Sequence, residues 1–133
     1  MTRVLIVEDE PLIAELVSTV LSDAGYDIVG IAADEPSAMT QASRTVPDFV
    51  VMDIKLANNS DGVEVAHRLQ SGRSIPILFT SAYLDHHTMK RAAATNPAGF
   101  LRKPYSPEAL LLAVAAVEQA AVKTRQPRQG LLN

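Results

Sequence analysis

The chain has 133 residues, of which 47% are hydrophobic and 20% are charged, and its formal net charge is -3 at pH 7. This length suits one domain with a single core, and the composition is that of a folded globular protein. The absence of cysteine excludes disulfides and thiolate metal sites, and the slightly negative charge argues against a chain that binds nucleic acid by itself.

Near the N-terminus, an acid follows the four-residue apolar run 4–7 at once. Such a run is too short for a signal peptide or a membrane span, so we expect a cytoplasmic location.

Short apolar runs alternate with amphipathic stretches along the chain. The apolar runs, each of which predicts a buried strand, are 4–7, 28–31, 49–52, 75–79 and 98–102. The stretches that follow them, which predict helices, are 11–25, 34–47, 61–71, 85–94 and 106–121. Five strands and five helices in alternation predict a parallel sheet wrapped by right-handed crossovers, with helices on both faces.

Residues at the boundaries support this division. Pro11 fits the first turn of a helix, where its missing N–H is not needed, and Asp61 is placed to cap another helix. The last segment, 122–133, is basic and contains proline and glycine. We therefore expect one folded domain over residues 1–121 and a flexible basic tail over 122–133.

Polar residues stand where four of the five strands end. Glu8 and Asp9 follow the first strand, Asp53 the third, Thr80 the fourth and Lys103 the fifth. Ligand sites in open parallel sheets form beyond the carboxyl ends of the strands, so we expect these side chains to converge. Carboxylates gathered there are costly unless a metal ion, a basic side chain or both join them. Oxygen ligands of this kind suit Mg²⁺, and a lysine and a hydroxyl can bind phosphoryl oxygens, so the set predicts a phosphoryl-transfer site.

With Asp61-Gly62, Thr80-Ser81 and Lys103-Pro104, this pattern resembles the receiver domain of a two-component response regulator, over about residues 3–121. The resemblance implies a flavodoxin-like fold, a doubly wound (βα)5 arrangement whose five-stranded parallel sheet has the order 2-1-3-4-5. It also implies a signalling module and not an enzyme, apart from its own phosphorylation and dephosphorylation.

The resemblance assigns roles to the acids. Asp53 matches the phosphoacceptor, which takes a phosphoryl group from a phosphohistidine. Asp9, Asp53 and the backbone carbonyl of Lys55 match the direct ligands of Mg²⁺, and Glu8 is expected to act on the ion through water.

Three further residues match the family residues that bind the phosphoryl group or respond to it. Lys103 matches the lysine that pairs first with the acids and then with the phosphoryl group. Thr80 matches the switch hydroxyl, and Phe100 matches the switch aromatic that turns inward when Thr80 moves. We also expect Phe100 to be a core residue.

The resemblance implies partners as well. The donor is expected to be a sensor histidine kinase or a histidine phosphotransfer protein, and the target an unidentified protein. Because only about a dozen residues follow the last predicted helix, we expect a stand-alone receiver that binds neither nucleic acid nor membrane directly. We expect a monomer or a weak dimer.

Other functions fit the sequence less well. A Mg²⁺-dependent phosphohydrolase with an aspartate nucleophile often has a second acid two residues later, where this chain has Lys55. A degenerate receiver that acts as a scaffold is disfavoured by the intact acid, threonine and lysine set. A nucleotide-binding protein is disfavoured because neither G-x-G-x-x-G nor a P-loop motif is present.

Some residues near the site have two interpretations. His86 and His87 could suggest a metal, but adjacent helical residues point in different directions, so we expect them to be solvated. Tyr83 and Tyr105 are either anchors for a partner or half-buried packing residues.

Overall fold

A computed structural model describes residues 2–82 and 85–132, with the side chains of 122–132 left out of the description. The strands are β1 (Arg3–Val7), β2 (Asp27–Ala32), β3 (Phe49–Asp53), β4 (Ile77–Ser81) and β5 (Gly99–Arg102). The helices are α1 (Pro11–Asp23), α2 (Glu35–Thr45), α3 (Gly62–Leu69), α4 (His86–Ala93) and α5 (Pro107–Leu132). All pairings are parallel, and the sheet order is β2-β1-β3-β4-β5, which confirms the predicted fold.

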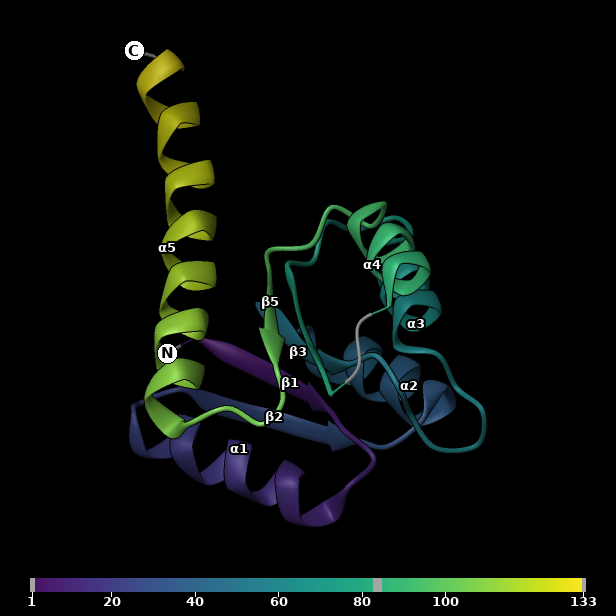
Figure 1. Ribbon diagram of the computed structural model, residues 1–133. Coiled ribbons are helices and arrows are strands. Elements are labelled where there is room, and N and C mark those ends of the chain that lie inside the picture. The colour runs from purple at the N-terminus through teal and green to yellow at the C-terminus, as the bar shows by residue number, and fades with distance from the viewer. Residues whose placement is uncertain (1, 83–84, 133) are drawn as a thin grey trace.

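The sheet lies between two layers of helices (Figure 1). Along β3, Phe49 and Val51 pack with α1 and α5, whereas Val50 and Met52 pack with α2 and α3. A strand between two such layers has no solvent face, which is why the sequence of β3 is continuously apolar until Asp53. The helices thus leave only the ends of the central strands open to solvent.

Local signals explain several boundaries. The Asp34 side chain caps α2 by accepting a hydrogen bond from the Ser37 N–H at 3.0 Å, and Ser37 returns the interaction in a capping box. The strand β4 begins at Ile77, two residues later than predicted. Pro76 has no N–H to donate, and its carbonyl accepts from the Val50 N–H at 3.0 Å, so it precedes the ladder.

The helix α5 is longer than predicted. We expected it to end near residue 121, but it continues to Leu132 and extends away from the sheet (Figure 1). An alanine-rich stretch, 113–121, favours helix propagation, and the next residues carry no strong stop signal before Pro127. The segment that we expected to be a tail is therefore helical up to Leu132, and the domain boundary at residue 121 stays a prediction.

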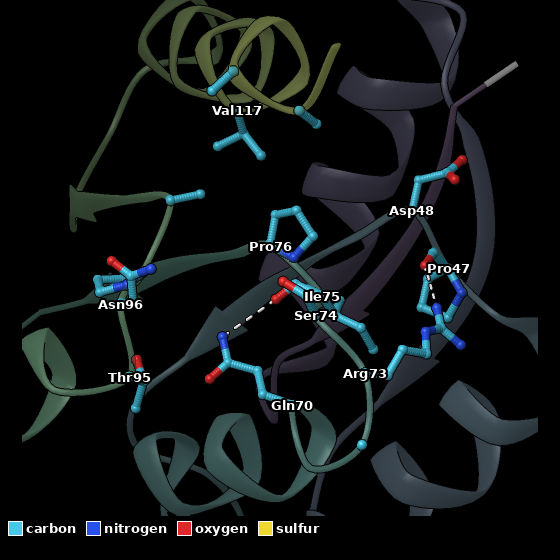
Figure 2. A pocket seen from close by; sticks show the side chains of 15 residues that line it. Pro47, Asp48, Gln70, Arg73, Ser74, Ile75, Pro76, Thr95, Asn96 and Val117 are labelled. Atoms are coloured by element: carbon cyan, nitrogen blue, oxygen red, sulfur yellow. Dashed lines mark hydrogen bonds between the residues drawn. The ribbon is translucent and has the colours of Figure 1, made fainter. Parts of the chain in front are cut away.

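At the amino ends of β3, β4 and β5 the surface is hollowed, with a volume of about 1070 Å³ (Figure 2). Two of the polar side chains there already bind neighbouring loops: Arg73 donates to the Pro47 carbonyl at 2.9 Å and Gln70 to the Ile75 carbonyl at 3.3 Å. The hollow lies at the opposite edge of the sheet from Asp53. Within the described residues, no helix is both long enough and apolar enough to cross a membrane.

Candidate functional site

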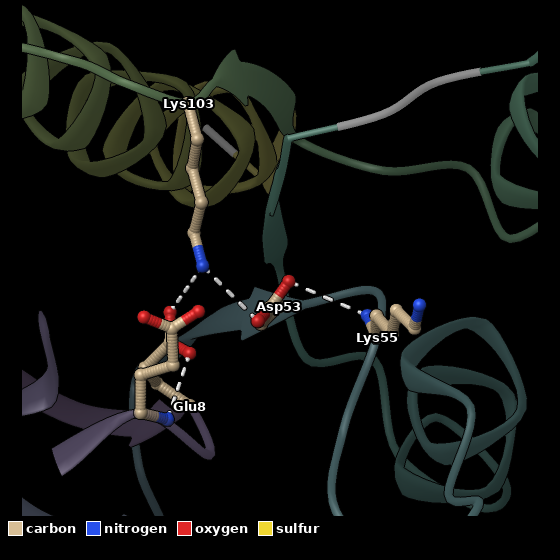
Figure 3. A network of polar contacts seen from close by, with 5 residues as sticks. Glu8, Asp53, Lys55 and Lys103 are labelled. Carbon is tan, nitrogen blue, oxygen red and sulfur yellow. Dashed lines mark hydrogen bonds and ion pairs between the residues drawn. The ribbon is translucent and has the colours of Figure 1, made fainter.

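The predicted polar residues meet at the carboxyl edge of the sheet, and Figure 3 shows Glu8, Asp53 and Lys103 of this set. Glu8 and Asp9 directly follow β1, and Asp53 is the last residue of the neighbouring strand β3. Thr80 lies in β4 in register with Asp53, and Lys103 directly follows β5. Four adjacent strands therefore bring five residues, distant in sequence, to one place.

Three carboxylates form the centre of the site. One oxygen each from Glu8, Asp9 and Asp53 lies within 4.8 Å of the other two. Glu8 and Asp53 are each only 5% exposed, and Asp9 is half-buried. Among the described residues this is the one group of acids and histidines close enough to hold a metal ion. Its ligands are all carboxylate oxygens, which suits a hard cation such as Mg²⁺.

Lys103 supplies the positive charge that this cluster needs. Its Nζ donates to Glu8 Oε1 at 2.6 Å and to Asp53 Oδ2 at 3.1 Å (Figure 3). The lysine side chain is 11% exposed, so both ion pairs are largely shielded from contact with water. The peptide bond from Lys103 to Pro104 is cis.

The burial of these groups shifts their protonation. The pKa of Glu8 is raised to about 7. Desolvation is the main cause, the neighbouring Asp53 adds to the increase, and the hydrogen bond from Lys103 opposes it. Burial alone would lower the pKa of Lys103, but its contacts with Glu8 and Asp53 outweigh this effect and raise it. The lysine is therefore charged at neutral pH, whereas Glu8 is poised between its two forms.

The turn after β3 fixes the backbone of Asp53. Asp53 Oδ1 accepts a hydrogen bond from the Lys55 N–H at 3.3 Å, and Lys55 forms an antiparallel bridge with Asp61. The Gly62 N–H donates to the Ile54 carbonyl at 2.6 Å. A β-carbon on Gly62 would lie 2.1 Å from the Asp53 carbonyl oxygen, so only glycine fits there.

Thr80 and Phe100 occupy different environments. Thr80 is buried, with 2% of its surface exposed, beside Asp53. Phe100 stacks on Phe79 with ring centroids 5.7 Å apart, yet it is 36% exposed. The expectation that Phe100 is a core residue is therefore wrong. It lies on β5, an outer strand of the sheet, where one side has no neighbouring strand.

Residues with two interpretations are partly settled. His86 and His87 are exposed at the start of α4, as expected of solvated side chains. Tyr105 is half-buried and packs against the core under α1 and α5, which favours the packing role. Tyr83 lies outside the described residues.

Sequence reasoning missed one contact close to the site. Arg91 of α4 forms an ion pair with Asp61, with Nη2 and Oδ2 2.6 Å apart. Nothing in the sequence pattern signals it, because the two residues are distant in sequence and a capping role for Asp61 does not indicate a partner on another helix.

Comparisons with known proteins agree with this geometry. The family model of the response regulator receiver domain matches residues 4–115. The transcriptional regulatory protein PdtaR of Mycobacterium tuberculosis is 36% identical over 124 residues, which cover 93% of this chain and 58% of PdtaR. The phyllosphere-induced regulator PhyR of Methylorubrum extorquens is 31% identical over 107 residues, covering 80% of this chain and 39% of PhyR.

A solved structure shows the same likeness. The signal receiver domain of a modulated diguanylate cyclase from Desulfovibrio desulfuricans superposes with a TM-score of 0.82 at 35% sequence identity. The match covers 92% of this chain and 98% of that one. By contrast, the chain spans only about half the length of the curated relatives that it matches.

Proposed function

Because the chain belongs to the response regulator receiver family, we propose that it is a phosphorylation-controlled switch with Asp53 as phosphoacceptor. The observation that carries the proposal is the position of Lys103, bonded to both Glu8 and Asp53 beside a third carboxylate, Asp9. One cation shared by buried acids leaves the site ready to receive the oxygens of a phosphoryl group.

In the proposed reaction, a carboxylate oxygen of Asp53 attacks the phosphorus of a phosphohistidine. The new O–P bond forms as the N–P bond breaks, and the imidazole nitrogen keeps the electron pair of the broken bond. Lys103 then donates to a phosphoryl oxygen in place of the carboxylate. The product is an acyl phosphate on Asp53, and no other reactant is consumed.

The acids provide the donor set for Mg²⁺. Asp9 and Asp53 would hold the ion with their carboxylates, together with the backbone carbonyl of Lys55, and Glu8 would act through water. The clustering of these three carboxylates within 4.8 Å supports this assignment. When bound, the ion neutralises charge on the phosphoryl oxygens during transfer.

Thr80 and Phe100 are the proposed switch. A phosphoryl group adds roughly -1.5 to -2 charge to the pocket and attracts the nearby Thr80 hydroxyl. Phe100 then turns inward, which changes the surface formed by α4, β5 and α5. The register of Thr80 with Asp53 and the partial exposure of Phe100 support this sequence of events.

The partners follow from this chemistry. The donor is a sensor histidine kinase or a histidine phosphotransfer protein, and the target is a protein that binds the switched surface. Direct contact with nucleic acid or membrane is not part of the proposal, and the net charge of -3 supports its exclusion of nucleic acid. A cytoplasmic monomer or weak dimer stays our prediction.

The proposal is tested by intact-mass analysis after incubation with acetyl phosphate or phosphoramidate and Mg²⁺. We expect one hydroxylamine-sensitive phosphoryl adduct in the unmodified protein and none in Asp53→Asn. Asp23→Asn, on the exposed end of α1, is the matched control and should be modified normally. A folded protein that accepts no phosphoryl group from either donor contradicts the proposal.

A further inference from the structure

The helix α4 is weakly attached to the rest of the molecule. Ala92 is its single buried residue, whereas α3, of the same length, buries Gly62, Val63, Val65, Ala66 and Leu69. Its first turn is capped locally, because Asp85 accepts from the Thr88 N–H at 2.6 Å. A helix with so little buried apolar surface has low local stability, so single contacts strongly affect its position.

Within the described residues, the one ion pair that α4 forms joins Arg91 to Asp61. The two side chains are each 36% exposed, and their Nη2 and Oδ2 atoms are 2.6 Å apart. Arg91 thus connects α4 directly to the turn that follows the acceptor strand, without passing through Thr80 or Phe100.

Asp61 is the fixed end of this connection. Its Oδ1 accepts from the Val63 N–H at 2.9 Å and caps α3. Its backbone pairs with Lys55, and the next residue, Gly62, donates to the Ile54 carbonyl at 2.6 Å. Asp61 is therefore restrained by three contacts that do not involve α4.

We propose that the Arg91–Asp61 ion pair is a latch that holds α4 in its present position and opposes the rearrangement caused by phosphorylation. This inference rests on the proposed function, because that function supplies the movement that the latch resists. A displacement of α4 lengthens a contact that is now 2.6 Å. Its attraction then falls as water enters, so the latch favours the arrangement seen here.

The latch also sets how readily the switch responds. A contact present in only one of two states shifts the equilibrium toward that state by its own free energy. An exposed ion pair adds little to the free energy of unfolding of a firmly packed protein. Here, however, the pair restrains a helix that has only one buried residue. Its loss should therefore favour the rearranged state by about two- to fivefold.

Three variants separate the latch from general effects of charge. Arg91→Gln keeps the length of the side chain but removes its charge. Asp61→Asn removes the other charge and still caps α3, since asparagine is an equally good capping residue. Arg68→Gln is the matched control, because it breaks an exposed 2.7 Å ion pair with Glu35 that joins α3 to α2 and not to α4.

The first measurement is amide hydrogen exchange along α4 in the unphosphorylated proteins. We expect exchange about two- to fivefold faster than normal in Arg91→Gln and in Asp61→Asn, with no further increase in the double variant. Exchange along α4 should be unchanged in Arg68→Gln. Unchanged exchange in Arg91→Gln, or equal acceleration in the control, overturns the proposal.

The second measurement is the phosphorylated fraction at limiting acetyl phosphate. The ratio of phosphorylated to unphosphorylated protein should rise about two- to fivefold in Arg91→Gln and stay unchanged in Arg68→Gln. An unchanged ratio in Arg91→Gln overturns the latch as a regulator. If even the unmodified protein is not phosphorylated, the proposed function fails, and hydrogen exchange alone decides whether the ion pair restrains α4.

Discussion

At the residue scale, Lys103 balances two buried carboxylates with one charge. In Lys103→Met, Glu8 and Asp53 lose the cation that now lies 2.6 and 3.1 Å from their carboxylate oxygens, and each keeps only a hydrogen bond from a backbone N–H. Removal of one partner from a buried ion pair typically costs about 3 kcal/mol or more. We expect the free energy of unfolding, measured with urea at pH 8, to fall by about that amount.

Two comparisons test the cause of this loss. The loss should be smaller at pH 5, where Glu8 is protonated and needs no cation. Lys90→Met, at an exposed position of α4, should change stability little. Equal losses in the two lysine variants would show that Lys103 does not stabilise the acid cluster.

Glu8 itself should make stability depend on pH. Its pKa is about 7 in the folded protein, against an ordinary value of 4.5, chiefly because it is buried. Between these values the folded protein binds a proton that the unfolded chain lacks. The stability contributed by this proton is fully present below pH 4.5 and is lost as the pH rises through about 7.

The variant Glu8→Gln should therefore lose less stability than the unmodified protein between pH 5 and 8, in the absence of Mg²⁺. From the difference between the folded and ordinary pKa values, Glu8 contributes at most about 3 kcal/mol to the pH-dependent free energy of unfolding. Urea unfolding across this range measures it, and Glu15→Gln, at an exposed position of α1, is the control. Parallel pH profiles for Glu8→Gln and the unmodified protein would refute a buried, proton-binding Glu8.

At the element scale, the turn between β3 and α3 determines where Asp53 lies. In Gly62→Ala the new β-carbon would approach the Asp53 carbonyl oxygen to 2.1 Å and the Ile54 Cα to 2.7 Å. Backbone atoms cannot move aside cheaply, so we expect a loss of about 2–3 kcal/mol in stability and slower phosphorylation of Asp53. Urea unfolding and intact-mass analysis measure these two effects.

Gly99→Ala is the control for this prediction. Its β-carbon would meet only the end of the Leu78 side chain, at 3.2 Å, which can turn away. We expect little change in stability and a normal rate of phosphorylation. If Gly62→Ala behaves like Gly99→Ala, the close approach of this turn does not position the acceptor.

Some elements could be predicted from sequence and others could not. The strands β1 and β3 were recognisable because burial on both faces requires continuous apolar residues. The end of α5 was not, because the helix continues past Pro127 and Gly130, residues that usually mark the end of a helix. The exposure of Phe100 depends on its position on the edge strand β5 and on what packs over that strand, and amphipathic patterns do not reveal packing between distant elements.

At the scale of the whole molecule, topology explains why the site was predictable. In a parallel sheet the residues after each strand must meet at one edge, so strand ends alone predicted that Glu8, Asp9, Asp53, Thr80 and Lys103 would converge. The individual contacts were not predictable. Strand order does not determine side-chain positions. It therefore does not reveal that Glu8 and Asp53 share Lys103, or that Arg91 pairs with Asp61.

The same convergence couples metal binding to the stability of the entire fold. The three carboxylates come from two strands, and in the unfolded chain Asp53 is far from Glu8 and Asp9. Mg²⁺ should therefore bind the folded state alone and stabilise it. When the Mg²⁺ concentration is about 100 times its dissociation constant, the free energy of unfolding should rise by about 2.7 kcal/mol. Chelation with EDTA should remove this gain.

The gain from Mg²⁺ should be larger at pH 8 than at pH 6, because near pH 6 Glu8 keeps the proton that competes with the cation. Asp9→Asn should lose most of the gain by removing one carboxylate of the cluster. Asp48→Asn, at the opposite edge of the sheet, should retain it. Thermal unfolding of the three proteins with and without Mg²⁺ provides the measurement. An equal gain in Asp9→Asn, or a larger gain at pH 6, would place the stabilising cation outside this cluster.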